Sequence, residues 1–240
     1  MRVQGANKNP NLTQVTETVV DTTTVTDSQS KQQIHNVFII DASGSMSGGK
    51  YERAISGVNE LLVSISQDTD TNNTVTVVEF ESSSIKRRLD AVTKIPSKYK
   101  GMGTGGSTPL NQALGETLEY IVGVRKDKFD ESDKILVNVL TDGEENSSYG
   151  KYANKELLGE YIKELESKGV TVTFIGTKKE VAYAVNHLSM DISNTMVHDN
   201  TAADITRSFG DTVLARKAYS KSVSRGEDVK KSFYTKTIEI

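Results

Sequence analysis

The sequence predicts an α/β domain with a doubly wound, mostly parallel sheet of about six strands, one antiparallel edge strand and helices on both faces. Short runs of β-branched and apolar residues alternate with longer segments whose apolar residues recur at helical spacing. Such alternation is typical of parallel strands joined by crossover helices. The runs 34–40, 135–140 and 170–176 are almost continuously apolar, as expected for strands that are covered on both faces.

The first half of this pattern begins with the strand predicted at residues 34–40 (IHNVFII). A helix is predicted from Lys50 to Ser66, because its apolar residues form one stripe at a spacing of three and four. Residues 74–80 predict the next strand. The more polar run 84–90 (SIKRRLD) predicts an edge strand, since exposed charges discourage pairing with another sheet.

A glycine-rich loop at residues 101–106 precedes the next predicted helix. Thr108 is expected to cap this helix, with Pro109 at its first position. A buried strand at 135–140 follows and ends just before Asp142. The remaining predicted elements are a helix around 157–165 that ends at Gly169, a strand at 170–176, a helix around 180–190, a short strand at 195–198 and a helix at about 202–217.

Composition excludes several classes of function. The chain has 240 residues and a formal net charge of −3, which does not attract nucleic acid or an acidic membrane. It has no cysteine, which excludes disulfides, thiolate metal sites and cysteine nucleophiles. No signal-peptide pattern and no run long enough to cross a bilayer is found. We therefore expect a cytoplasmic protein, or a virion component if a phage encodes the chain.

Three regions are predicted along the chain. Residues 1–33 are expected to form a polar arm, because a segment rich in Thr, Asn, Gln and Ser buries too little apolar surface to offset its ordering entropy. Its alternating Thr and Val residues are also compatible with a strand added to a partner. Residues 34–218 are expected to form the domain. Residues 219–240 are expected to form a tail or an extra strand.

Polar side chains gather where three of these segments meet one edge of the predicted sheet. Asp41, Ser43 and Ser45 follow the first strand, Thr108 follows the glycine-rich loop, and Asp142 follows the strand 135–140. In an open α/β sheet the ligand site lies beyond the carboxyl ends of the strands, where the topology changes direction. We therefore expect these five side chains to form one site.

The chemistry of this set indicates a metal-bridged docking point and not a catalytic centre. It offers carboxylate and hydroxyl oxygens, which suit Mg²⁺, and also Mn²⁺ or Ca²⁺, better than zinc or copper. A divalent ion held largely by hydroxyls retains much of its charge and attracts an anionic ligand from outside. A carboxylate of another protein is the natural candidate. We therefore expect a protein that is not an enzyme.

The same segments resemble a known family. Asp41-x-Ser43-x-Ser45, the run Gly105–Leu110 (GGSTPL) and Thr141–Asp142–Gly143 resemble, in order and context, the metal-ion-dependent adhesion site (MIDAS) of von Willebrand factor A domains. The resemblance covers about residues 34–218 and is closest to small intracellular bacterial or phage versions. It implies that Ser43, Ser45 and Thr108 contact the metal through hydroxyls, whereas Asp41 and Asp142 hold it directly or through water.

The resemblance also implies a function. A Mg²⁺ ion at this site would bind a Glu or Asp residue of a partner protein, and the chain would act as an adaptor or as a component of an oligomeric assembly. Binding of nucleic acid or of a membrane is not expected. An alternative is a structural subunit, for example of a phage particle, that is held through its arm and tail without metal.

Two enzymatic alternatives use the same residues. One is a nucleotide-binding phosphohydrolase: Gly44 to Lys50 has the spacing of a phosphate-binding loop, but Tyr51 stands where such a loop needs Ser or Thr for Mg²⁺. A phosphoryl-transfer aspartate at Asp41 would need a second Asp two residues later, where the chain has Ser43. The plainest alternative is that residues 41–46 form an ordinary Ser/Gly turn. Glu144 and Glu145 are expected to be solvated loop charges.

Overall fold

The computed structural model describes residues 30–82, 84–124, 132–229 and 232–234. Its sheet has six strands in the order β3-β2-β1-β4-β5-β6. The strands are β1 (Gln33–Asp41), β2 (Asn72–Glu81), β3 (Ser84–Val92), β4 (Lys134–Leu140), β5 (Val170–Gly176) and β6 (Thr195–Val197). All pairings are parallel except that of β2 with the edge strand β3. The predicted doubly wound sheet with one antiparallel edge strand is confirmed.

The direction of strand order changes next to β1. β1 lies between β2 and β4 and pairs with both in parallel, with Ile40 level with Leu140. The chain moves from β1 outward to β2 and β3, and then returns to place β4 on the other side of β1. The loops that follow β1 and β4 therefore emerge side by side at one edge of the sheet, which is where open α/β sheets place their ligand sites.

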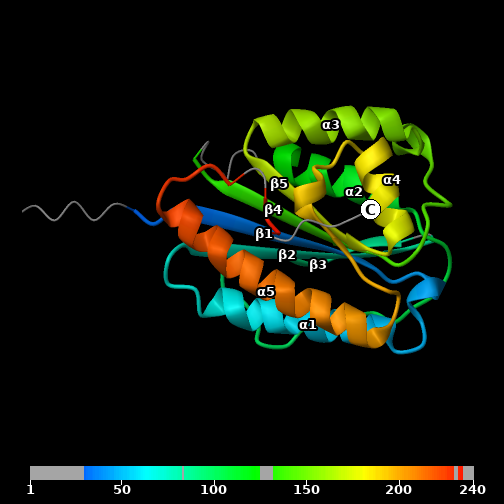
Figure 1. Cartoon of the computed structure of the whole chain (residues 1–240), viewed down its shortest axis with the longest axis horizontal. Coiled ribbons are helices and arrows are strands. Elements are labelled where there is room, and N and C mark those ends of the chain that lie inside the picture. Colours follow the sequence, from blue (N-terminus) through cyan, green and yellow to red (C-terminus); the bar gives the residue numbers. More distant parts are fainter. Residues whose placement is uncertain (1–29, 83, 125–131, 230–231, 235–240) are drawn as a thin grey trace, which may run out of the picture. The chain divides into compact units, whose positions relative to one another are not determined.

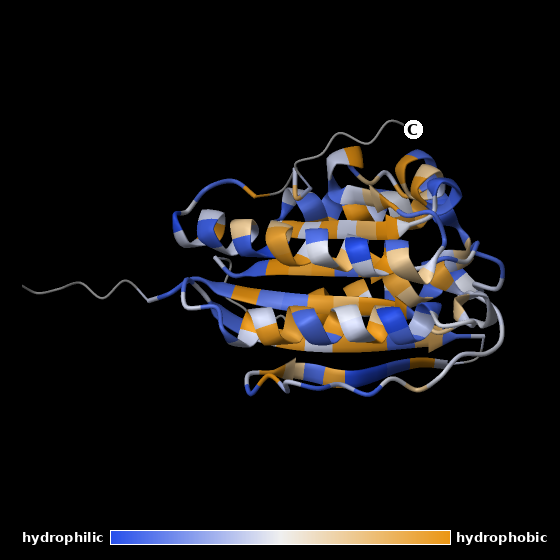
Figure 2. Cartoon of the chain, turned by 60° about the horizontal axis from the view of Figure 1, so that its bottom comes forward, coloured by the Kyte–Doolittle hydropathy of each residue, from blue (hydrophilic) through white to orange (hydrophobic). Residues whose placement is uncertain are grey.

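Helices cover both faces of the sheet (Figure 1). The long helices α1 (Lys50–Ser66) and α5 (Ala202–Ser224) lie side by side on one face. The helices α2 (Leu110–Glu119), α3 (Lys155–Ser167) and α4 (Lys178–His187) lie on the other. Two apolar clusters result, one on each face of the sheet. The apolar colour that runs through the strands in Figure 2 reflects this double burial.

Helix α1 has the predicted bounds, Lys50–Ser66, because its apolar stripe supplies the contact with the sheet. Its buried residues include Tyr51, Val58, Leu62 and Ile65. At the sheet edge, the predicted polar strand is β3, and its central residues 86–88 are exposed. A lysine and two arginines therefore occupy a strand edge that faces solvent.

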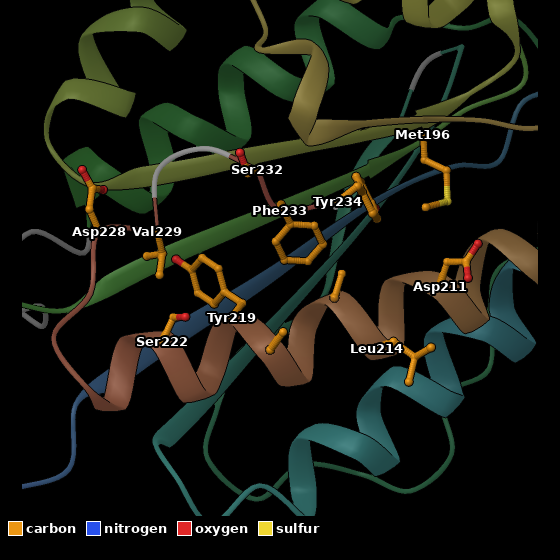
Figure 3. A pocket seen from close by; sticks show the side chains of 12 residues that line it. Met196, Asp211, Leu214, Tyr219, Ser222, Asp228, Val229, Ser232, Phe233 and Tyr234 are labelled. Atoms are coloured by element: carbon orange, nitrogen blue, oxygen red, sulfur yellow. The ribbon is translucent and has the colours of Figure 1, made fainter. Parts of the chain in front are cut away.

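The C-terminal part of the domain differs from the prediction. Helix α5 continues past Lys217, where the sequence predicts its end, to Ser224. Among the residues expected to form a tail, Tyr219, Phe233 and Tyr234 are buried in the apolar cluster of the α1 and α5 face (Figure 3). A backbone hydrogen bond from Tyr234 N–H to the Ser193 carbonyl also holds this segment against the domain. The aromatic side chains therefore extend the core beyond residue 218.

The sequence also predicts a polar N-terminal arm at residues 1–33 and no membrane-spanning segment. The predicted N-terminal arm lies outside the described residues up to residue 29. Among the helices of the described ranges, none combines the length and apolar character needed to cross a bilayer.

Candidate metal centre

Asp41, the last residue of β1, is completely buried at the edge of the sheet. Its Oδ1 atom accepts a hydrogen bond from the Ser43 N–H at 2.7 Å, and its Oδ2 atom accepts one from the Thr141 hydroxyl at 2.5 Å. Burial raises the pKa of Asp41 to about 6, and these hydrogen bonds offset the effect only in part. The nearby charge of Asp142 raises the pKa further. A cation beside these carboxylates would offset both the burial of Asp41 and its repulsion by Asp142.

The hydroxyls of Ser45 and Thr108 and one oxygen of Asp41 converge on the space left by the absent side chain of Gly143. The Oγ atoms of Ser43 and Ser45 lie 2.9 Å apart. A Cβ atom built on Gly143 would lie 2.8 Å from Ser45 Oγ, 2.8 Å from Thr108 Oγ1 and 3.4 Å from Asp41 Oδ2. Oxygen atoms from the end of β1 and the loop after it, and from the glycine-rich loop, therefore face one small space that only a glycine leaves open.

Asp142 contributes the second carboxylate, and its side chain is fully buried. One oxygen, Oδ2, accepts a hydrogen bond from the ammonium group of Lys50. The other oxygen, Oδ1, is buried without a hydrogen-bond partner in the part of the chain that the structure describes. A buried carboxylate oxygen without a partner is costly unless a cation or another donor approaches it.

The N-terminus of α2 is capped differently from the prediction. The helix begins at Leu110, Pro109 occupies the capping position, and the predicted Thr108 side-chain cap is not formed. The caps come instead from the loop after Asp142. Glu145 Oε2 accepts from the Asn111 N–H at 2.7 Å, and Ser148 Oγ accepts from the Gln112 N–H at 2.9 Å.

A third contact joins these two loops. Asn146 Oδ1 accepts from the Thr108 N–H at 2.9 Å, and the Asn146 N–H donates to the Thr108 carbonyl at 3.2 Å. Because the helix end and the Thr108 backbone are satisfied by this loop, the Thr108 hydroxyl is not used as a cap. The prediction that Glu145 is a solvated loop charge is wrong, because this side chain also accepts hydrogen bonds from Ser147 and Ser148.

The donor set fits a hard divalent cation. The five side chains offer only carboxylate and hydroxyl oxygens, which suit Mg²⁺, Mn²⁺ or Ca²⁺. Across the described residues, no group of three or more His, Cys, Asp and Glu side chains is placed to hold a metal. A metal at this edge would therefore depend on the hydroxyls as well as on the two carboxylates. The site opens into a surface depression of about 520 Å³ lined by Ser45, Thr108, Asp142, Thr177 and Asn200, among others.

Several residues that support this centre were not identified from the sequence. Thr141 anchors Asp41, and its place beside Asp142 in the turn was the available signal. Asn200 accepts a hydrogen bond from Lys50 at 3.2 Å, and its own N–H donates to His198 Nδ1 at 3.1 Å. Burial lowers the pKa of His198 below its usual value, which favours the neutral ring that accepts this bond. No local sequence pattern near the candidate centre points to His198 and Asn200, because these two residues follow β6 and the centre follows β1 and β4.

The sequence of residues 37–210 matches the von Willebrand factor type A domain. The chain belongs to the von Willebrand factor type A (VWA) domain family. The matched range includes all five residues of the candidate centre. VWA domains are often protein-interaction modules that hold a divalent metal at a MIDAS.

Solved structures share this fold. The ArnB paralog VWA2 from Sulfolobus acidocaldarius is 20% identical, with a TM-score of 0.53 and coverage of 76% of this chain and 46% of that chain. Proximal thread matrix protein 1 (PTMP1) from the mussel byssus, solved with a zinc-occupied MIDAS motif, is 14% identical, with a TM-score of 0.56 and coverage of 78% and 46%. The SpRpn10 VWA domain is 10% identical, with a TM-score of 0.54 and coverage of 78% and 95%.

These identities are low enough that the likenesses show the fold alone. The matched region is less than half the length of the ArnB paralog and of PTMP1, whereas it spans almost all of the SpRpn10 VWA domain. The VWA fold of the described domain is therefore found within longer proteins as well as in a single VWA domain.

Proposed function

We propose that this VWA domain is a non-enzymatic binding module that holds Mg²⁺ with Asp41, Ser43, Ser45, Thr108 and Asp142 and docks an acidic residue of a partner protein. The convergence of Ser45, Thr108 and Asp41 oxygens around Gly143 carries the proposal. The buried Oδ1 atom of Asp142, which has no hydrogen-bond partner among the described residues, supports the proposal, because a divalent cation is the group that best offsets such an oxygen.

The donor set accounts for the expected choice of ligand. A bound Mg²⁺ would offer an electrophilic position to an incoming carboxylate. Hydroxyls supply three of the five donor side chains, so much of the positive charge stays available to that carboxylate. The opening of the site into a surface depression gives an external side chain access to the centre. Mn²⁺ and Ca²⁺ suit the same oxygens.

This function requires a protein partner, and the domain does not catalyse a reaction on that partner. We infer an adaptor or an assembly component of the bacterial or phage type, acting in the cytoplasm or in a virion. The phosphate-binding alternative gains no support from the structure, because the Lys50 ammonium is engaged by Asp142 and Asn200.

The first experiment is a calorimetric titration of the purified chain with Mg²⁺ and with Mn²⁺. We expect one binding site in the wild type and no detectable binding in Asp142→Ala, with both proteins giving the same circular dichroism spectrum. Glu160→Ala, an exposed substitution on α3, serves as the control that retains binding. Metal binding by Asp142→Ala at wild-type strength would contradict the proposed centre.

The second experiment tests the partner. Affinity capture from host lysate would be run with excess Mg²⁺ and with EDTA, using the wild type and Asp142→Ala. A partner retained only by the wild type with Mg²⁺ would support docking through the metal. A partner retained under all conditions would contradict it and would place the interaction on the arm, the tail or another face.

A further inference from the structure

The Lys50 ammonium group contacts one ligand of the candidate centre, Asp142. This group donates to Asp142 Oδ2 and, at 3.2 Å, to Asn200 Oδ1. The Lys50 side chain is 17% exposed and the Asp142 side chain is fully buried, so solvent screens this ion pair only weakly. The contact joins residues 92 positions apart in the chain.

The stability of helix α1 does not account for this lysine. Lys50 is the first residue of α1, where the helix dipole disfavours a positive charge and favours an acidic residue. The backbone before it turns through Gly48 and Gly49, both at positive φ (76° and 92°). This turn brings the start of the helix close enough for the lysine to reach the loop after β4. The contacts with Asp142 and Asn200, and not the stability of the helix, therefore account for a lysine at this position.

The Lys50 ammonium group changes the net charge of the metal-loaded centre. The carboxylates of Asp41 and Asp142 together cancel the charge of one divalent cation, so a metal-loaded centre without Lys50 would be neutral. When only the metal, the five ligand side chains and Lys50 are counted, the Lys50 ammonium on Asp142 gives the loaded centre one excess positive charge. Like charges repel, which weakens metal binding, while the same excess positive charge attracts an anionic ligand.

We propose that Lys50 tunes the specificity of this site, because its ammonium group lowers the affinity for the divalent cation and raises the affinity of the loaded centre for a carboxylate ligand. This inference rests on the proposed function, since it concerns the same metal. It assigns to Lys50 a role that differs from the phosphate-binding role considered from the sequence.

The test uses Mn²⁺ alone as the first probe, with the full chain and calorimetric detection. We expect Lys50→Met to bind Mn²⁺ about tenfold more tightly than the wild type, because one nearby positive charge is removed. Lys50→Arg, which keeps the charge, is expected to stay near the wild type. Lys151→Met removes a lysine from an exposed ion pair with Glu119 and is the matched control, with unchanged affinity. Circular dichroism melts would verify that each variant is folded.

The second probe is acetate, a carboxylate ligand of the loaded centre. Relaxation of the acetate methyl protons by bound Mn²⁺ would measure its affinity. We expect acetate to bind more weakly to Mn²⁺-loaded Lys50→Met than to the loaded wild type. Equal acetate affinity in the two proteins would overturn the selection of an anionic ligand by Lys50.

The outcomes separate this inference from the proposed function. Unchanged or weaker Mn²⁺ binding by Lys50→Met would overturn the role of Lys50 while leaving the metal centre in place, and weaker binding would show that Lys50 positions Asp142 instead. If neither protein binds Mn²⁺, both the metal centre and the role of Lys50 are overturned. Tighter binding by Lys50→Met together with weaker acetate binding would support the inference.

Discussion

The Oγ1 atom of Thr108 lies 2.8 Å from the point that a Cβ atom on Gly143 would occupy. Real Cβ atoms essentially never approach an oxygen this closely, so the hydroxyl and a larger residue at position 143 are incompatible without a shift. The glycine that follows Asp142 thus keeps open the space into which the hydroxyls point. Position 143 is therefore a glycine because of this space, and not only because a turn favours a flexible residue.

Gly143→Ala is therefore expected to impair metal binding while the domain remains folded. The added methyl group would displace the Ser45 and Thr108 hydroxyls, which can rotate away without disturbing the core. We expect the affinity for Mn²⁺ to fall by about tenfold or more, as measured by calorimetry. Gly210→Ala, at an exposed position of α5 where the new methyl group meets no neighbour, is the control. Wild-type affinity in Gly143→Ala would contradict the convergence of the hydroxyls on this space.

Glu145→Ala is expected to weaken both the helix α2 and the metal centre. It removes the side chain that accepts the Asn111 N–H, and loss of such a cap costs about 1 kcal/mol of unfolding free energy. Thr108 precedes the same helix end, so its hydroxyl would be less well positioned. Glu144→Ala is the matched control, because the contact of Glu144 within the described part of the chain is an exposed ion pair with Lys179. Urea denaturation would measure both variants, and equal stability of the two would contradict the capping role.

A metal ion that binds only the folded chain should stabilise it. At a free concentration of 100 times Kd, a single ligand adds about 2.7 kcal/mol to the free energy of unfolding. We expect saturating Mg²⁺ to raise the melting temperature of the wild type and EDTA to reverse the rise. The melting temperature of Asp41→Asn should not respond to Mg²⁺. A response of equal size in both proteins would place the stabilising ion elsewhere.

The buried ion pair between Arg216 and Asp68 predicts loss of stability in acid. Nη1 of Arg216 on α5 lies 2.6 Å from Oδ2 of Asp68, and the two side chains are only 1% and 6% exposed. Burial alone would raise the pKa of Asp68, but hydrogen bonds from Ser220 and Arg216 and the charge of Arg216 outweigh it and hold the pKa below its usual range.

A depressed folded-state pKa stabilises the domain above the unfolded value of about 3.9, and this contribution is lost as the pH falls below that value. We therefore expect the free energy of unfolding of the wild type to fall steeply below about pH 4. Asp68→Asn should show a shallower fall in that range. At pH 7 it should be less stable by about 3–5 kcal/mol, because Arg216 is left buried without its charge partner. If the free energy of unfolding of the wild type and of Asp68→Asn fell in parallel with pH, the role of the Arg216–Asp68 ion pair would be contradicted.

Much of the fold could be predicted because its signals are local. Helix α1 and strand β5 have the predicted bounds, Lys50–Ser66 and 170–176, since apolar periodicity over one segment determines which face is buried. The edge position of β3 followed from its own charges. The end of α5 did not, because the residues after Lys217 are polar on average and are held by separate contacts of aromatic residues such as Tyr219.

By itself, the sequence determined the alternation of strands and helices, the VWA resemblance and the five side chains that the structure brings to one edge. Only the tertiary structure decided how these side chains are supported. The pairing of Lys50 with Asp142 and the capping of α2 by Glu145 join loops that are distant in the chain. Such contacts depend on strand order and register, and no local pattern of residues records which loops the sheet will bring side by side.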